Sequence, residues 1–414
     1  MSEWKLKKLS ELGKFSRGKS KHRPRNDENL FINGTYPLVQ TGEIKNSNLY
    51  VIRNNDYYNE FGLSQSKLWP EGTLCITIAA NIAETAILAY PMCFPDSIVG
   101  FNSYPNESSE LFVYYIFEFI KKEIQKTSSG SIQDNINIDY LTNLQLMVPG
   151  KAYQDKIVEL LSSLDQKIAL NNQINEELEA MAKTLYDYWF VQFDFPDENG
   201  KPYKSSGGKM VYNDQLKREI PEGWGVEKVS EIAKTGSGGT PKSTTAEYYS
   251  NGTIPWINSG ELNKSIIIST TNYITEFGLE NSSAKLFPAD SILIAMYGAT
   301  AGKVSFLAFE SSTNQAICAV TLDDNRLKYY FKFFIEDLYL HLVTLSSGSA
   351  RDNLSQELIR NLLMTIPDER VVENFFNLVD SYFLQITNNL KQNQELTQLR
   401  DWLLPMLMNG QVKV

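Results

Sequence analysis

One part of this chain recurs 218 residues later, and this repetition constrains the fold more than any other feature of the sequence. Residues 127–135 read TSSGSIQDN and residues 345–353 read LSSGSARDN, and the tetrapeptide EFGL occurs at residues 60–63 and again at 276–279. This spacing is far above the roughly 20–50 residues of a solenoid repeat. It predicts a domain duplicated together with a linker helix, and therefore an internal two-fold and two equivalent working surfaces.

With 414 residues, the chain exceeds what one hydrophobic core supports and suits two or three domains. Cys75, Cys93 and Cys318 are isolated from one another in sequence, which predicts neither a zinc site nor a disulfide framework. The N-terminal residues are polar and charged, and no apolar run approaches the ~18 residues of a membrane span. We therefore expect a cytoplasmic protein with no metal site and no membrane contact.

The charge is unevenly distributed. The formal net charge of −10 argues against a protein that binds nucleic acid by bulk electrostatics alone. Residues 1–26, however, carry nine Lys and Arg against two Glu, whereas residues 151–194 carry four basic and eight acidic side chains. This contrast predicts a local phosphate-facing patch, including Lys19, Lys21, Arg23 and Arg25, and an acidic surface that faces protein.

The expected fold class is α+β, with two similar mixed α/β domains separated by two long antiparallel coiled-coil helices. Strand-like runs at residues 73–79 and 85–90 and aromatic-rich helical patterns at residues 110–126 and 327–345 support this class. In chain order we predict a first domain (1–150), a central helix (151–194), a linker loop (195–220), a second domain (221–367), and a distal helix with a C-terminal tail (368–414).

The two long helical patterns share one seam. Apolar residues at alternating three- and four-residue steps indicate a heptad repeat over residues 151–190, and the same phase recurs up to Pro405. Asparagines occupy equivalent seam positions in both patterns, at Asn171 and Asn175 and at Asn389 and Asn393. Because a polar seam residue costs stability but determines register, we predict that the two helices pair in one defined alignment.

No catalytic motif is present: the chain contains neither an adenine-methylation loop nor a phosphate-binding, zinc-protease or serine-hydrolase signature. The glycine-rich segment at residues 236–242 lacks the spacing of a phosphate loop and indicates a flexible loop, in which Lys242 is a candidate DNA phosphate contact. Gln133 and Arg351 are the variable positions of the repeated SSGS turn. They are candidate base readers, since Gln pairs with adenine and Arg with guanine, but a purely structural role of the turn explains the repetition equally well.

The two copies also differ where one strand-like run leads into the next. Residues 78–84 read IAANIAE, and their counterpart at residues 296–303 reads MYGATAGK, which places Lys303 among the candidate DNA contacts. Two domains that recognise different targets would keep the same framework and differ in the side chains of their loops. Neutral drift gives the same pattern.

The sequence resembles the DNA-specificity subunits of type I restriction-modification systems over essentially its whole length. The resemblance is carried by the FGL and KLxP stretches of both copies and by the following segments: PEGW at 221–224 with VSEI at 229–232, INEELEAMA at 174–182, YWF at 188–190, and LRDWLLPMLMNG at 399–410. It implies a non-catalytic subunit that reads a bipartite double-stranded DNA sequence, one half per target-recognition domain.

The resemblance also implies partners. Two adenine-methylating subunits and two restriction and translocase subunits are expected to assemble on this chain. S-adenosylmethionine, ATP and Mg are expected to bind those partners, and this chain is expected to hold no cofactor. The alternatives are a stand-alone DNA methyltransferase, which the missing motifs disfavour, and a non-catalytic coiled-coil scaffold, which would not require two elaborate domains.

Overall fold

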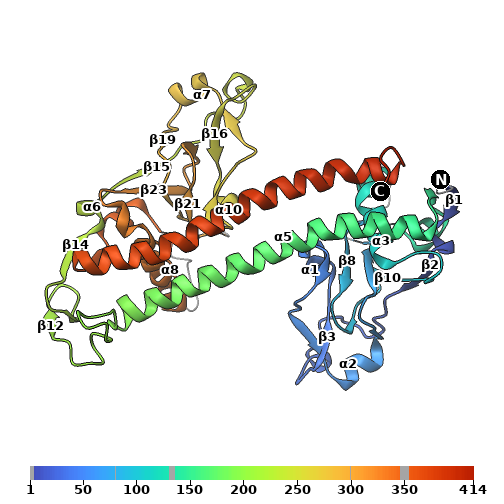
Figure 1. Cartoon of the computed structure of the whole chain (residues 1–414), viewed down its shortest axis with the longest axis horizontal. Helices are drawn as coiled ribbons and strands as arrows, with labels where there is room; N and C mark the ends of the chain where they lie inside the picture. The colour runs from blue at the N-terminus through green and yellow to red at the C-terminus, as the bar shows by residue number, and fades with distance from the viewer. Residues whose placement is uncertain (1–3, 80, 130–135, 299, 346–353) are drawn as a thin grey trace. The chain divides into compact units, whose positions relative to one another are not determined.

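The computed structural model describes residues 4–79, 81–129, 136–298, 300–345 and 354–414. Contacts divide the chain into two compact units: unit 1 comprises Met1–Ala169 with Asn393–Val414, and unit 2 comprises Leu170–Gln392. Each unit holds one copy of the repeat together with part of both long helices, α5 (Lys151–Tyr186) and α10 (Glu369–Met408) (Figure 1). The predicted fold class is therefore confirmed.

In unit 1 the domain contains two sheets of four or five strands, besides a two-stranded one. The five-stranded sheet has the order β2 (Gly13–Arg17), β10 (Ile98–Ser103), β7 (Leu74–Thr77), β8 (Thr85–Leu88), β4 (Tyr50–Val51). The four-stranded sheet has the order β5 (Asp56–Tyr58), β3 (Tyr36–Leu38), β9 (Met92–Cys93), β6 (Leu68–Trp69). Pairing is antiparallel except between β4 and β8 and between β3 and β9.

Unit 2 repeats this topology. Its five-stranded sheet has the order β15 (Ala233–Ser237), β23 (Ile317–Leu322), β20 (Ile292–Ala295), β21 (Val304–Leu307), β17 (Ile266–Ile267). Its four-stranded sheet has the order β18 (Tyr273–Ile274), β16 (Ile254–Ile257), β22 (Ser311–Thr313), β19 (Leu286–Phe287). The parallel pairs, β17 with β21 and β16 with β22, are equivalent to those of unit 1, so the duplication extends to every strand of both sheets.

Short elements complete each copy. Unit 1 has a two-stranded sheet of β1 (Lys5–Lys8) and β11 (Gln145–Val148), with η1 (Leu9–Glu11), η2 (Glu28–Leu30), α1 (Thr41–Asn46), α2 (Glu60–Gln65), α3 (Glu110–Ser129) and α4 (Ile138–Asn143). Unit 2 has β14 (Gly225–Lys228) paired with β24 (Leu363–Ile366), with α6 (Val229–Ile232), η4 (Ala246–Tyr248), η5 (Ser259–Glu261), α7 (Glu276–Glu280), η6 (Asn325–Leu327), α8 (Lys328–Leu345) and α9 (Gln356–Asn361).

The core of each unit includes side chains from both long helices. In unit 1, the aromatic face of α3 packs with sheet residues, and Ile157 of α5 and Leu407 of α10 are fully buried in the same cluster. In unit 2, α8 packs in the same way with Trp189, which follows α5, and with Phe375 of α10. Burying one such side chain stabilises the fold by about 1.5–3 kcal/mol. The helices are therefore part of both domain cores.

Buried polar contacts tie each domain helix to the long helices. In unit 1, the hydroxyl of Tyr115 on α3 donates to Asp165 Oδ2 of α5 at 2.7 Å, and Arg400 of α10 binds the other oxygen of the same carboxylate at 2.8 Å. In unit 2, Lys332 of α8, only 1% exposed, binds Glu179 of α5 at 3.1 Å. Unit 2 also has a Tyr–Asp contact like that of unit 1, in which the Tyr329 hydroxyl of α8 donates to Asp380 Oδ1 of α10 at 2.6 Å.

The seam predicted from the heptad pattern is inside the helix pair. In unit 2, the Asn389 amide donates to Asn175 Oδ1 at 2.8 Å, and the Asn171 amide donates to Gln392 Oε1 at 2.7 Å. These partners require α5 and α10 to run antiparallel there. The same direction holds in unit 1, where Asp165 of α5 meets Arg400 of α10.

Helix α10 does not stop before Pro405, where the sequence pattern predicts its end, but continues through the proline to Met408. A proline inside a helix costs about 3 kcal/mol, because it removes one hydrogen bond and crowds the preceding turn. The burial of Leu404, Leu407 and Met408 in the core of unit 1 offsets this cost. Gly410 lies two residues beyond the last residue of the helix, and its φ of +68° is the left-handed conformation that glycine adopts readily.

The segment predicted as a linker loop contains regular structure. An antiparallel hairpin of β12 (Met210–Asn213) and β13 (Arg218–Pro221) lies within it. The Phe195 ring stacks between the rings of Tyr203 and Trp224, with centroid separations of 4.7 and 5.2 Å. Proline and glycine content indicates turns correctly, but the aromatic packing that orders this segment depends on Trp224, which lies beyond it in sequence.

The asparagine pair yields a stability prediction. Asn389→Leu alone leaves Asn175 without its amide donor and should lower the free energy of unfolding by about 1 kcal/mol. Leucine at both Asn175 and Asn389 should restore or exceed wild-type stability, because both members of the buried pair are then apolar. The Gln385 amide, which donates to Asn389 Oδ1 at 2.8 Å, is exposed and can bind water instead. Thermal unfolding measures both effects. Gln173→Leu, at an exposed position of α5, is the control, and a double variant less stable than the single one would contradict the prediction.

Candidate nucleic-acid interface

Three segments of unit 1 meet at one edge of the five-stranded sheet. They are residues 18–25 after β2, the β7–β8 turn, and residues 94–97 before β10. Because β10 is antiparallel to both β2 and β7, the ends of these strands lie at the same edge. Backbone hydrogen bonds connect the segments: Lys19 N donates to Phe94 O at 3.2 Å, and Ile78 N donates to Ser97 O at 3.0 Å. We call this the turn edge of unit 1.

Asp96 is the hub of the turn edge. Its carboxylate forms ion pairs with Arg25 and, at 3.5 Å, with Arg23, and its carbonyl oxygen accepts a hydrogen bond from Arg17 Nε at 2.6 Å. The arginine side chains remain about half exposed. One carboxylate therefore holds an arginine cluster in place without neutralising it.

The other two predicted cations of this segment are held through their backbone. Lys21 N donates to Gln65 O at the end of α2, at 3.1 Å, and the Lys21 side chain is exposed. Lys19 is half-buried, and its carbonyl accepts from Ser66 Oγ at 2.8 Å. All four cations predicted in residues 19–25 therefore lie on one ordered segment.

His22 lies among these cations but binds a carboxylate. Its Nε2 atom is 2.7 Å from Asp27 Oδ2. The backbone N–H of Asn29, together with the His22 ring, holds the pKa of Asp27 below its usual range. The His22 ring also contacts Phe61 edge-on, with 5.4 Å between the centroids. His22 thus connects the basic segment to α2.

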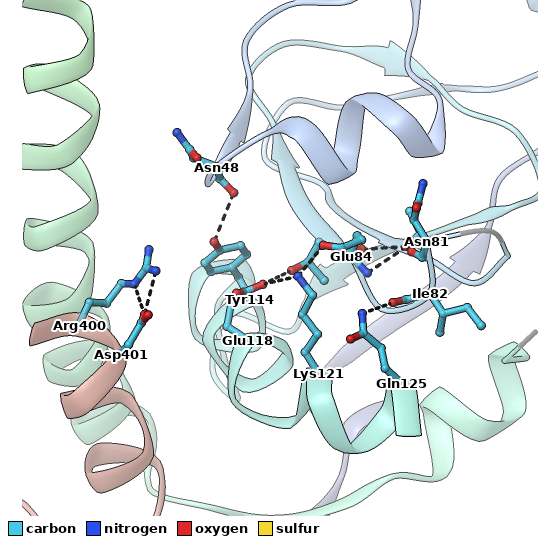
Figure 2. Close-up of polar contacts among 12 residues, drawn as sticks. Asn48, Asn81, Ile82, Glu84, Tyr114, Glu118, Lys121, Gln125, Arg400 and Asp401 are labelled. Carbon is cyan, nitrogen blue, oxygen red and sulfur yellow. Dashed lines mark hydrogen bonds and ion pairs between the residues drawn. The ribbon is translucent and has the colours of Figure 1, made fainter. Parts of the chain in front are cut away.

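Helix α3 holds the β7–β8 turn (Figure 2). Lys121 forms an ion pair with Glu84, and Gln125 Nε2 donates to Ile82 O at 3.0 Å. Glu118 accepts from Thr85 Oγ1 at 3.2 Å, and burial raises the pKa of the Glu118 carboxyl. Both sides of the turn are thus fastened to a helix that belongs to the domain core.

Unit 2 has an equivalent turn edge, formed by residues 238–245, the β20–β21 turn and residues 313–316. Gln315 occupies the position equivalent to Asp96. Its side chain accepts a hydrogen bond from Thr240 Oγ1, and its carbonyl accepts from Tyr297 OH at 3.0 Å. The structure therefore brings the segment of Lys242 and the turn of Lys303 to the same place, and both lysine side chains are exposed.

The glycines of residues 236–242 serve packing. Gly236 lies within β15, and a Cβ on Gly238 would be 2.1 Å from Thr313 O. Gly239 N donates to the same carbonyl at 2.8 Å. The predicted flexible loop is thus partly a strand, and its glycines permit close backbone approach.

The side chains of the two edges differ where the backbone is equivalent. In unit 1, Glu84 pairs with Lys121 of α3. In unit 2, the equivalent residues are the exposed Lys303 and Tyr339 of α8. A Cβ on Gly302 would lie 2.0 Å from the Tyr339 ring, which explains why a glycine precedes Lys303. The two edges therefore present different hydrogen-bonding groups on one frame.

Both edges carry a surplus of positive charge. In unit 1 the three segments hold four Lys and Arg against the carboxylates of Glu84 and Asp96, and in unit 2 they hold Lys242 and Lys303 and no carboxylate. Each edge thus has two uncompensated cations on a chain whose net charge is −10. Such local patches suit an anionic ligand such as a nucleic-acid backbone.

Sequence reasoning located some members of these edges and missed others. Gln133 and Arg351, the candidate base readers, lie outside the described residues. Asp96 and Gln315 were not predicted, because nothing in the sequence near them indicates contacts with segments about 70 residues away. Aligning the two copies, which places Asp96 opposite Gln315, is the one signal that could have found them.

Other site types find no support in the described part of the chain. Among those residues, no group of three or more His, Cys, Asp or Glu is arranged to hold a metal ion. Within the same residues, every helix is too short or too polar to cross a bilayer. The three cysteines are free and buried, and burial raises the pKa of Cys93 to about 11.

Comparison with known proteins agrees with this geometry. A model of the type I restriction modification DNA specificity domain matches residues 1–180 and 221–398. The chain is 26% identical over its whole length to the MjaIX type I restriction enzyme specificity subunit of Methanocaldococcus jannaschii, covering 94% of that protein. It is 28% identical to the HindI specificity subunit of Haemophilus influenzae over 74% of this chain and 75% of that protein.

A solved structure has the same fold. The S subunit of a type I restriction-modification system from M. genitalium matches with a TM-score of 0.57 at 17% identity, over 98% of this chain and 96% of that one. This likeness extends through both copies of the repeat.

The hub role of Asp96 predicts a local effect. Asp96→Ala should release Arg23 and Arg25 and speed amide hydrogen exchange in residues 17–25 about fivefold, equivalent to about 1 kcal/mol of lost local stability. Hydrogen-exchange mass spectrometry measures this rate. Glu107→Ala, which breaks the ion pair with Lys7 elsewhere in the domain, is the control. Unchanged exchange in residues 17–25 would show that Asp96 does not hold the segment.

Proposed function

Because this chain belongs to the type I restriction modification DNA specificity family, we propose that it is the subunit that determines which DNA sequence a type I restriction-modification complex recognises. Each domain would read one half of a split double-stranded target. The resemblance indicated by the sequence motifs is confirmed by the match of the family model to both copies.

One observation carries this proposal: the same turn edge is built twice from equivalent segments, with different side chains. Asp96 in one copy stands opposite Gln315 in the other, and Glu84 stands opposite Lys303. A single ligand bound twice would favour identical side chains. Two different base sequences, each attached to the same phosphate backbone, favour one frame with a shared positive charge and altered polar groups.

We assign roles to the candidate residues on this basis. Arg17 and the predicted cations of residues 19–25 contact phosphates in one half-site, and Lys242 and Lys303 contact phosphates in the other. Gln133 and Arg351 remain the proposed base readers, with adenine and guanine as their preferred bases.

The partners follow from the same proposal. Two adenine-methylating subunits assemble on the chain, two restriction and translocase subunits join that core, and these partners bind S-adenosylmethionine, ATP and Mg. The chain itself is non-catalytic and acts in the cytoplasm. Apolar side chains on both long helices support docking of other subunits, since the following are 42–58% exposed: Leu170, Met181, Leu378, Leu384, Leu399 and Trp402.

Exchange of one domain tests the assignment of half-sites. Residues 1–150 are replaced by the first domain of a relative, the methylating partner is co-expressed, and adenine methylation is mapped across the genome. Only one half of the methylated motif should change, because each domain has its own sheets and its own turn edge. Exchange of residues 221–367 is the reciprocal control. A change in both halves after either exchange would contradict independent reading.

The long helices should determine the gap between the half-sites. Removing one heptad from both α5 and α10 shortens each by about 10 Å, which corresponds to about three base pairs of duplex. The methylated motif should keep both halves and lose about that many base pairs from its gap. Removing a heptad from α5 alone mismatches the seam and should abolish assembly. An unaltered gap after the paired deletion would show that helix length does not determine the spacing.

A further inference from the structure

The repeated EFGL motif forms equivalent short helices that the functions above do not use. It begins α2 in unit 1 and α7 in unit 2. In each domain this helix lies on the side facing away from the long helices (Figure 1).

Packing accounts for the glycine and the leucine of both motifs. A Cβ on Gly62 would lie 2.7 Å from Leu30 O, and one on Gly278 would lie 2.7 Å from Tyr248 O, so both positions require glycine. Leu63 and Leu279 are half-buried. Each helix is also capped, because Asn59 accepts from Gly62 N and Thr275 accepts from Gly278 N, both at 3.0 Å.

Packing does not account for the phenylalanine. Phe61 is 44% exposed and Phe277 is 54% exposed. Each ring touches one neighbouring ring, His22 and Tyr248 respectively, at 5.4 Å between centroids. An exposed Phe at one position of a surface helix is ordinary. The same exposed Phe in both copies, beside turns whose other residues differ, indicates a ligand feature common to both sites.

Both helices are connected to a basic segment, whose cations suit an anionic ligand. Helix α2 is joined to the basic segment at both of its ends, through the His22 ring on Phe61 and through the hydrogen bond from Lys21 N to Gln65 O. In unit 2, the backbone N–H of Thr275, the residue before α7, donates to Tyr248 O of η4. The η4 helix begins directly after residues 238–245, in which the Lys242 carbonyl accepts from Thr245 N at 3.0 Å. Each Phe is therefore tied to the basic segment of its own turn edge.

We propose that Phe61 and Phe277 make apolar contacts with double-stranded DNA, each in the half-site read by its own domain. An aromatic ring next to phosphate-binding cations can pack against a thymine methyl group or a deoxyribose, or enter a base step. This inference rests on the proposed function and adds an apolar contact to its polar ones. A partner protein is the less suitable occupant, because it would have to bury the exposed cations of the adjoining basic segment, whereas DNA phosphates would pair with them.

The test compares Phe61→Ala, Phe277→Ala and the control Tyr104→Ala. Tyr104 is 48% exposed in the same domain as Phe61, but its backbone N–H bonds to Leu12 O, at the opposite edge of the sheet. Each variant is purified as a complex with the methylating subunit. Its affinity is measured for a duplex bearing the motif that the wild-type complex methylates, and for duplexes with one half of that motif scrambled.

Each phenylalanine variant should assemble normally and bind the intact duplex about 10-fold more weakly. Scrambling the half of the motif read by the N-terminal domain should cost Phe61→Ala about 10-fold less affinity than it costs wild type, because the contact with the ring is already lost. Phe277→Ala should behave in the same way toward the other half. Tyr104→Ala should match wild type.

Three results would overturn the inference. If wild type discriminates its motif and both variants bind as wild type does, the rings do not contact DNA and the proposed function stands. If the phenylalanine variants fail to assemble while Tyr104→Ala assembles, the rings contact a protein subunit. If the wild-type complex methylates no defined motif, the proposed function fails and this inference fails with it.

Discussion

The burial of the long helices inside the domain cores is the constraint on which the rest of the structure depends. Ile157 and Leu407 are fully buried in the cluster that contains the sheet and α3 of unit 1, and Phe375 has the same place against α8 in unit 2. The polar anchors, Asp165 between Tyr115 and Arg400 and Glu179 with Lys332, add direction to this apolar contact. Each turn edge is held in turn by α3 or α8. A displacement of either domain helix would therefore be transmitted to the surface proposed to read DNA.

The two turn edges have equivalent backbones but different side chains. Asp96 holds three arginines, whereas the equivalent Gln315 holds a threonine and a tyrosine. Glu84 and Lys303 differ in sign, and the neighbouring helices differ as well: Lys121 of α3 pairs with Glu84, whereas Tyr339 of α8 lies against Gly302, next to Lys303. The residues that hold the turns have thus changed together with the turns, whereas strand order and pairing direction have not.

What the sequence predicts correctly here rests on local patterns. The aromatic helices and the asparagine seam follow from patterns over one or two dozen residues, and the repeat follows from two short segments that match 218 residues apart. The structure has all of them. Three features depend on distant contacts and could not be predicted. Helix α10 passes through Pro405 because Leu407 and Met408 reach the core of unit 1. The 195–220 segment is ordered around Trp224, and Asp96 binds arginines that lie about 70 residues earlier in the sequence. The candidate cations were predicted by composition, but their common location could not be.

The discontinuity of unit 1 has a consequence for biosynthesis. Unit 2 is one continuous stretch, Leu170–Gln392, whereas the core of unit 1 includes Leu404, Leu407 and Met408 at the far end of α10. Chains emerge from the ribosome N-terminus first, so the domain synthesised first is completed last. Until then its apolar surface for α10 stays uncovered, and a nascent chain released early would carry one finished domain and one unfinished domain. Only a chain translated as far as residue 408 can complete both cores.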